Sequence, residues 1–336
     1  MSDREKPIRG LPAIHEAREL RESRKGIPTA SSAFWLWSLI GVAVISIFYW
    51  RHAQGQNDRT RARILAKQRP LADEAGPRFT ELRDKVEKFA QLLAKPGTLE
   101  EYVDPEAAIG EKGDPAIFKR PGLYLRIAQP NAETSEKLRA AARESARDAF
   151  TACLLRTPHV SEHGGTACHK SKECQRGQIC NEIGVCATPS SPYNLRVAYR
   201  GMFPLEESWV RDVQTSSEEL RLRLRETEID SLIANDWPVA VGALTAAEYL
   251  LILVDEVPKD FKPKEGDSLE EGLSSEVHPV RVGLMDLKSG RTLFKLRREV
   301  DVHVPVVPGA NVDAQRRQII NCALARDVRE SLTVAK

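Results

Sequence analysis

The sequence predicts an α+β protein with a single N-terminal transmembrane helix, a helical stalk and a small mixed sheet domain that carries a disulfide-held cysteine-rich loop. Three observations lead to this prediction: an uncharged apolar segment near the N-terminus, six cysteines of which four are evenly spaced, and strand and helix periodicities in the remainder. The expected parts are a cytoplasmic tail (1–30), the membrane helix (31–51), the stalk (52–97) and an exported domain (98–336) with a cysteine-rich insert (157–192).

The apolar segment begins at Ala33, ends at Trp50 and holds no charged residue. As a helix, its 18 residues cover roughly 27 Å, which is close to the hydrocarbon thickness of a bilayer. Aromatic residues cluster at both ends, where amphipathic rings settle among lipid headgroups. A buried soluble helix is the alternative, but core helices are seldom apolar on all sides over such a length. We therefore expect the segment to span a membrane.

The residues around this segment bear on its retention and orientation. Ala53-Gln54-Gly55 has the small-x-small pattern of a cleavage site, which leaves cleavage after Gly55 open, whereas Arg51 and the aromatics before it favour retention. Basic residues are more numerous after the segment than before it, but a large domain can translocate despite such charge, and disulfides suit an oxidising compartment. We expect a single-pass inner or cytoplasmic membrane protein with a cytoplasmic N-terminus and a periplasmic or extracellular C-terminal domain.

Composition excludes several classes of protein. The chain has 50 basic and 48 acidic residues, a net charge of +2, and no basic face interleaved with aromatic residues stands out. Nucleic acid is therefore not an expected partner. The sequence has no phosphate-binding loop, dinucleotide fingerprint or H-E-x-x-H motif, so we expect no cofactor.

Two helical stretches are predicted after the membrane segment. The strongly basic segment 51–68 is expected to continue the helix until Pro70, where we expect it to end. This segment is either solvated or in contact with anionic lipid headgroups. The second helix ends at Pro96-Gly97 and has apolar residues at three- and four-residue steps. We expect its apolar face to pack against the chain's own domain rather than a second copy. This face consists of Phe79, Leu82, Val86, Phe89 and Leu93.

The domain is predicted to begin with a loop, a strand and a helix. Residues 98–120 are rich in Gly, Pro and Asp and are expected to be loop. Residues 122–129 predict a short strand, whose end is set by Pro130. Asn131 or Thr134 is then expected to cap a helix that runs to about Leu155.

A second strand is predicted after the cysteine-rich segment, from the alternation of Leu195, Val197 and Tyr199. Residues 206–235 are expected to be mostly helical, and the continuous apolar run 249–257 a central strand. The candidate buried positions of the helical part are Trp209, Val213, Leu220, Leu224, Ile229, Leu232 and Ile233.

The last third of the chain is predicted to contain a loop, a hairpin and a helix. Residues 259–276 are acidic and lack periodicity, so we expect a surface loop, and residues 279–302 predict a β-hairpin. Asn311 or Asp313 is expected to cap a final helix that runs to about Leu332. This order of elements favours a small α+β sheet domain. Whether the hairpin edge is free to accept a partner's strand is left open.

Four of the six cysteines follow one spacing, C-x5-C-x5-C-x5-C. This segment resembles the short cysteine-rich repeats of secreted bacterial and extracellular proteins, written C-x5-C-x2-G-x2-C, and Gly177 and Gly184 stand at the glycine positions. The resemblance covers only residues 168–186, and it implies a disulfide-held knob rather than an activity. The four cysteines are Cys168, Cys174, Cys180 and Cys186.

A segment this short, without an apolar core, needs cross-links to hold one shape. Of the three possible pairings we expect the alternating one, in which the first of the four cysteines pairs with the third and the second with the fourth. Cys153 and Cys322 lie on different predicted helices and either pair with each other or stay as buried thiols. A zinc site with His159, His163 and His169 is the alternative, but uniform five-residue gaps fit zinc knuckles poorly.

One further string has a family resemblance. Gly266-Asp267-Ser268-Leu269 resembles the nucleophile block of SGNH-type esterases, which implies Ser268 as a nucleophile. In that family the string follows an early buried strand, and an Asp-x-x-His pair lies near the end of the chain. Here the string lies in a charged loop, and Asp301-Val302-His303 has the wrong spacing. Without a positioned base the hydroxyl is not activated, so we expect no enzyme.

These observations favour a membrane-anchored envelope protein whose exported domain acts as an interaction or scaffold module for another protein or a cell-wall component. A signal transducer that recruits a cytoplasmic partner through its short tail is the alternative. A hydrolase that uses Ser268 is the third class.

Overall fold

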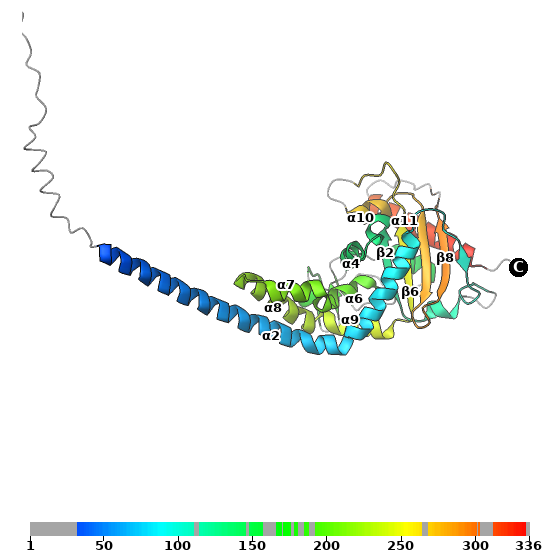
Figure 1. Ribbon diagram of the computed structural model, residues 1–336. Helices are drawn as coiled ribbons and strands as arrows, with labels where there is room; N and C mark the ends of the chain where they lie inside the picture. Colours follow the sequence, from blue (N-terminus) through cyan, green and yellow to red (C-terminus); the bar gives the residue numbers. More distant parts are fainter. Residues whose placement is uncertain are drawn as a thin grey trace, which may run out of the picture. The chain divides into compact units, whose positions relative to one another are not determined.

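Helix α2 (Ser32–Ala94) is the longest element of the computed structural model (Figure 1). By length and composition alone it is apolar and long enough to cross a membrane. The chain divides into two compact units, of which the first ends at Arg59 and the second begins at Thr60. The structure describes residues 32–110, 114–145, 148–156, 166–169, 171–175, 178–180, 185–187, 192–263, 268–300, 302 and 312–333.

Helix α2 continues through two prolines, so the predicted end at Pro70 is wrong. A proline removes one backbone donor and displaces the carbonyl four residues earlier, which bends a helix without necessarily ending it. Figure 1 shows the ribbon of α2 bending in its light-blue to cyan part, where Pro70 and Pro77 lie. Leu71 and Phe79, on either side of the bend, are both buried in the core of the domain. This burial stabilises the helix where local propensity opposes it.

A mixed six-stranded sheet forms the centre of the second unit, in the order β1-β8-β7-β6-β2-β5. Strand β2 is parallel to both of its neighbours, β5 and β6, whereas β6, β7, β8 and β1 pair antiparallel in turn. The strands predicted at 122–129 and 249–257 and the predicted hairpin are confirmed as β2, β6 and the β7-β8 pair. The bounds are β1 Tyr102–Val103, β2 Gly122–Ala128, β5 Tyr193–Asn194, β6 Tyr249–Asp255, β7 Val280–Asp286 and β8 Thr292–Arg298.

The chain's own β1 covers the outer edge of the hairpin. Tyr102 lies opposite Lys295 in the antiparallel register, and the backbone N–H of Asp104 donates to the carbonyl of Leu293 at 2.7 Å. Part of the segment expected to be loop therefore closes this edge, and a further short helix lies at Ala116–Lys119. A covered edge offers fewer unpaired backbone groups to another chain.

Helices cover both faces of the sheet (Figure 1). Alternate residues of β2 face opposite cores: Leu125 faces the core made with α2, α4 and α6 to α9, and Tyr124 faces the core made with α5 and α11. The predicted final helix is confirmed as α11. The bounds are α3 Gln129–Ala132, α4 Ser135–Glu144, α5 Ala149–Leu155, α6 Leu195–Gly201, α7 Glu207–Thr215, α8 Glu219–Ala234, α9 Asp236–Ala246, α10 Leu269–Ser274 and α11 Val312–Leu332.

The strand predicted from Leu195, Val197 and Tyr199 is wrong, because these residues form helix α6. The Asn194 side chain accepts a hydrogen bond from the backbone N–H of Arg196 at 2.8 Å, which caps the helix. Leu195 and Tyr199 are one turn apart and both fully buried, so the same apolar residues also satisfy a helical period.

Three other expectations need correction. The single helix expected up to residue 155 is divided into α3, α4 and α5, and Thr134 caps α4. The expected surface loop 259–276 contains α10. On α8, Leu220 and Leu224 are exposed rather than buried, and Leu222 takes the core position between them.

Arg281 on β7 closes the C-terminal end of α2. Its guanidinium donates to the carbonyls of Leu93, Lys95 and Gly97, while its Nε donates to Glu256. The last carbonyls of a helix have no partner within the helix and favour a nearby cation. Arg281 is 4% exposed, so these hydrogen bonds form away from water.

Two further contacts fix the same end of α2. Gln129 Nε2 donates to the carbonyl of Ala94 at 2.9 Å. A Cβ at Gly283 of β7 would lie 2.7 Å from the ring of Phe89, so a glycine is required where the helix meets the sheet. The segment expected to form a stalk therefore ends inside the core of the domain.

Replacing Arg281 tests how strongly α2 is held. Arg281→Met should lower the free energy of unfolding by about 3 kcal/mol, because Glu256 and the helix-end carbonyls lose a buried partner. Arg297→Met is the matched control, since Arg297 bonds the same Glu256 at 2.8 Å but is 40% exposed. That control should cost less than about 1 kcal/mol. Denaturation of the full-length chain in detergent measures both, and equally small losses would show that the contacts with α2 contribute nothing.

Candidate functional site

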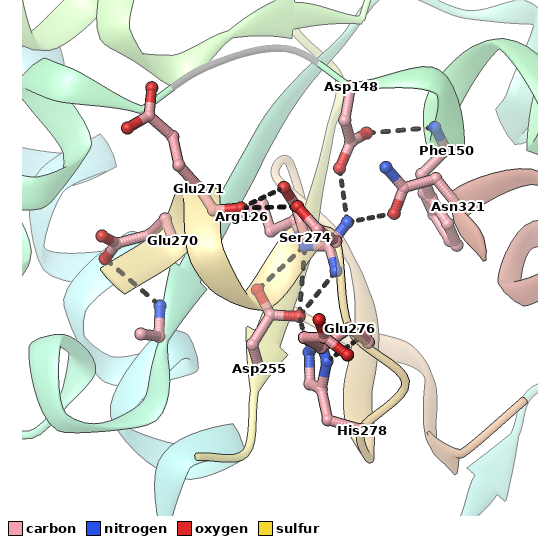
Figure 2. A network of polar contacts seen from close by, with 12 residues as sticks. Arg126, Asp148, Phe150, Asp255, Glu270, Glu271, Ser274, Glu276, His278 and Asn321 are labelled. Atoms are coloured by element: carbon pink, nitrogen blue, oxygen red, sulfur yellow. Dashed lines mark hydrogen bonds and ion pairs between the residues drawn. The ribbon is translucent and has the colours of Figure 1, made fainter. Parts of the chain in front are cut away.

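A buried cluster of polar side chains surrounds Arg126 of β2 (Figure 2). The guanidinium holds Asp255 with two groups, Nε to Oδ2 at 2.8 Å and Nη2 to Oδ1 at 2.8 Å. Nη1 donates to Asp148 Oδ2 at 2.8 Å and to Asn321 Oδ1. Arg126, Asp255 and Asn321 are 7%, 0% and 2% exposed, so the cluster lies inside the protein.

Strand pairing explains why these residues meet. In the parallel register Arg126 lies opposite Leu253 and Ala128 opposite Asp255, so the two charges lie on neighbouring strands at the carboxyl end of the pair. In open α/β sheets, ligands usually bind at the carboxyl ends of the parallel strands. The usual position is the place where the connections from neighbouring strands leave in opposite directions. Strand β2 has such a place, because its parallel neighbours β5 and β6 lie on opposite sides. The cluster is therefore the first candidate for a functional site.

His278 extends the cluster towards β7. One ring nitrogen, Nε2, lies 2.9 Å from Asp255 Oδ1, and the other, Nδ1, lies 2.8 Å from the carbonyl of Glu276. An Asp-His pair orients the base in hydrolytic triads, but there the second ring nitrogen faces the nucleophile. In His278 both ring nitrogens already face oxygen acceptors, and the side chain is 0% exposed. The pair is arranged to support structure rather than to move a proton to a substrate.

The electrostatics of the cluster are dominated by opposing effects of burial and charge. Burial lowers the pKa of Arg126, but Asp255 and Asp148 raise it well above the ordinary value. Burial raises the pKa of Asp255, but Arg126 and His278 outweigh this and hold the pKa at about 2. Burial and Asp148 together raise the pKa of Tyr124, whose hydroxyl donates to Asp148 Oδ2 at 2.8 Å. Arg126 and Asp255 are therefore held in their charged forms by their neighbours, and Tyr124 in its neutral form.

A disulfide between Cys153 and Cys322 joins the two helices that complete the cluster. Asp148 caps α5, which carries Cys153, and Asn321 precedes Cys322 on α11. The bonded cysteines are 169 residues apart in sequence. The chain-entropy estimate for so long a loop is about 5 kcal/mol. The disulfide thus holds in place the two groups that Arg126 Nη1 needs.

The cysteine-rich insert contains two further disulfides, Cys168 with Cys180 and Cys174 with Cys186, and a short antiparallel strand pair, Ile179–Cys180 with Cys186–Ala187. Of the three possible connectivities this is the alternating one. A small hollow is lined by Ile179 and Cys180 of the insert and by Arg196, Val197, Arg200 and Asp236 of the domain.

The zinc alternative depends on the redox state of these cysteines. The sulfurs of Cys168, Cys174 and Cys186 lie within 4.8 Å of one another, which is close enough for one metal ion if they were reduced. Only thiolates ligate zinc, and in the structure these sulfurs are in disulfides. His159 and His163 lie outside the described residues. Zinc therefore stays the alternative to the disulfide interpretation, and it applies only to the reduced protein.

Ser268, the residue of the esterase-like string, caps helix α10. Its hydroxyl accepts from the backbone N–H of Glu271 at 3.2 Å, and the Glu271 carboxylate accepts from the backbone N–H of Ser268 at 3.0 Å. This reciprocal pair is a capping box, which explains a serine at this position by helix stability alone. Asp301 and His303 lie outside the described residues.

Comparison of the chain with protein-family models, curated proteins and solved structures finds no match. The site must therefore be judged from its own geometry. Sequence reasoning did not single out Arg126, Asp255 or His278. The available signal was a charged residue, Arg126, in the middle of an otherwise apolar predicted strand, and a second one, Asp255, near the end of another predicted strand.

Removing Arg126 tests whether the cluster supports structure or function. Arg126→Met should lower the free energy of unfolding by about 3–5 kcal/mol, because two buried carboxylates lose their cation. Thermal or chemical denaturation measures the loss, with Arg326→Met as the control, since Arg326 is 82% exposed and pairs with Glu330 on its own helix. A variant that keeps its stability would instead indicate that Arg126 is reserved for a ligand.

The low pKa of Asp255 predicts a pH dependence of stability. Asp255 titrates at about 2 when folded, and at about 3.9 in an unfolded chain. The unfolded chain therefore takes up the proton first, and stability falls as pH decreases from about 4 to about 2. The contribution, on the order of 2 kcal/mol, is complete above about pH 4 and is lost near pH 2.

Asp255→Asn should flatten this part of the stability profile, measured by denaturant unfolding over the same pH range. Glu330→Gln is the control, because this carboxylate is 62% exposed. It should leave the profile as it is in the unsubstituted chain. A profile that is equally steep with Asp255→Asn would show that other carboxylates carry the whole dependence.

Proposed function

We propose that the chain is a single-pass, membrane-anchored envelope protein whose exported domain serves as an interaction or scaffold module. The observation that carries this proposal is the exposure of the first part of α2. Large apolar side chains between Trp35 and Trp50 are 44–76% exposed, and Phe48 is the most exposed at 76%. In water this surface would be very unfavourable, whereas a bilayer covers it and the helix satisfies its own backbone.

The disulfides support export of the domain. The structure has three disulfides, and its cysteines leave no free thiol. Disulfides persist in oxidising compartments and are rare in the cytosol. Together with the anchor, they favour a cytoplasmic N-terminus and a domain in the periplasm or outside the cell.

The polar cluster supports a scaffold more than an enzyme. Arg126, Asp255 and His278 use their hydrogen-bonding groups on one another and on the chain around them. The proposed partner is another protein or a cell-wall component, which would contact the surface of the domain rather than this buried cluster.

A signal transducer is the second candidate, and the contacts at the end of α2 favour it. Because Arg281 and Gln129 bind the end of the helix, a displacement of β7 would be passed to α2. A transducer would need residues 1–30 to recruit a partner inside the cell, and these residues lie outside the described part of the chain.

Thiol counting tests the proposed location. Protein purified from membranes without reductant, blocked, reduced and labelled again should show all six cysteines protected when its intact mass is read. Six free thiols, with zinc in the same sample, would place the domain in the cytoplasm and make the insert a metal site.

Deleting residues 2–26 then separates the two candidates. A scaffold that acts through its exported domain should keep its cellular phenotype, because the anchor and the domain are unchanged. Loss of the phenotype with normal amounts of membrane-inserted protein would favour the transducer.

A further inference from the structure

Helix α8 presents two exposed leucines one turn apart. Leu220 is 70% exposed and Leu224 is 62% exposed, while Leu222 between them is fully buried. Among the described residues from 60 onwards, the next most exposed large apolar side chain is Tyr102 at 44%. An exposed apolar pair on an otherwise charged helix marks a candidate contact surface.

Helix α8 lies beside α2 (Figure 1). Lys67 Nζ pairs with Asp230 Oδ1 at 2.7 Å, and Arg63 Nη2 lies 3.5 Å from Glu226 Oε2, and in both pairs the residues are 163 positions apart. Because the offset is constant, residue numbers increase in the same direction along α2 and α8, so the two helices are parallel. The first turn of α8, with Leu220, therefore points towards the end of the second unit at which α2 enters it.

The turn between α7 and α8 is tied to α2 a short distance along the chain from the membrane segment. Arg61 donates to the carbonyls of Val213 and Ser216 at 3.2 and 2.8 Å. Arg61 follows Trp50 by eleven residues, which rise about 16 Å in a helix and span less than about 40 Å when extended. If Trp50 lies at the membrane interface, the first turn of α8 is within that reach of the bilayer surface.

The charges around the leucines suit a phospholipid surface. Arg221 and Arg223 are 54% and 69% exposed, and each has a carboxylate partner, Asp212 and Glu219 respectively. The chain from 51 to 69 adds further basic residues. Leucines flanked by exposed arginines are typical of helices that lie in the headgroup region, with apolar side chains buried about 5–10 Å deep.

We infer that Leu220 and Leu224 dock into the headgroup region of the same bilayer that α2 spans. This inference rests on the proposed membrane anchor. The bilayer is favoured over a second copy of the chain because the leucines lie at the end of the domain that is tethered to the anchor. With α2 as one attachment and α8 as the other, the domain would be held to the bilayer at two points.

A lipid-quenching experiment on the full-length chain tests the docking. The native cysteines are in disulfides, so an introduced cysteine is the single free thiol for an environment-sensitive fluorophore. Leu220→Cys and Leu224→Cys replace exposed side chains and leave the core untouched. Each labelled protein is placed in nanodiscs of phosphatidylcholine and phosphatidylglycerol, without quencher or with lipid that carries a nitroxide either near the headgroup, to test positions 220 and 224, or along the acyl chain, to test position 44.

Two reference positions calibrate the measurement. Val44→Cys reports on the membrane segment itself, and Arg326→Cys on an exposed position of α11. Docking is supported if quenching at 220 and 224 is severalfold greater than at 326. It is overturned if quenching at 220 and 224 equals that at 326 while position 44 is quenched, in which case the anchor stands.

Two other results also decide the matter. If the fluorophores at 220 and 224 report an apolar environment only in discs that hold two copies of the chain, and the lipid quencher does not reach them, bilayer docking is overturned. The leucines are then assigned to an interface between copies. If position 44 is not quenched, the membrane anchor itself fails, and the inference fails with it.

Discussion

The ion pair between Arg126 and Asp255 is the interaction on which the rest of the domain depends. Removing two charges from water costs several kcal/mol per ion, and their attraction offsets this cost only when the remaining donors and acceptors are also bonded. Nη1 of Arg126 therefore requires Asp148 and Asn321, and Asp255 requires His278. One pair on β2 and β6 thus fixes α5, α11 and the segment before β7.

The same strands also hold the long helix. Glu256 directly follows Asp255, the last residue of β6, and binds Arg281, which in turn closes the end of α2. Gln129 directly follows β2 and binds the carbonyl of Ala94. The polar cluster and the end of α2 are therefore built on neighbouring residues of two strands. A change that shifts β2 against β6 would disturb both, so the C-terminal part of α2 is an integral part of the domain rather than an attached stalk.

Sequence patterns predicted the elements whose residues are buried on regular periods. Strand β6 was evident as a continuous apolar run, β2 as a short strand ended by Pro130, and α11 and the hairpin as periodic segments. The failures have two causes, one tertiary and one local. Burial of the surrounding face carries α2 through Pro70, and the capping side chain of Asn194 turns an apparent strand into a helix.

The polar cluster was beyond single-sequence reasoning for a related reason. The partners of Arg126 are 22, 129 and 195 residues away in sequence, so no local spacing brings them to attention. A charge inside an apolar strand signals only that some partner exists. Its identity is decided by the register of β2 with β6 and by the docking of α11.

The packing of α8 against α2 explains why Leu220 and Leu224 are exposed. Half-exposed ion pairs such as Lys67 with Asp230 contribute little free energy, about 0–1 kcal/mol, so they do not by themselves hold α8 beside α2. Burial of Ile64, Leu222 and Ile229 in one core does, and it fixes which face of α8 is turned away. Leu220 and Leu224 are therefore exposed by the packing of their own helix, and not because the helix is loosely held. Isolated exposed leucines are common on soluble proteins. A pair at the end of the domain tied to the apolar segment has a bilayer within reach to cover it.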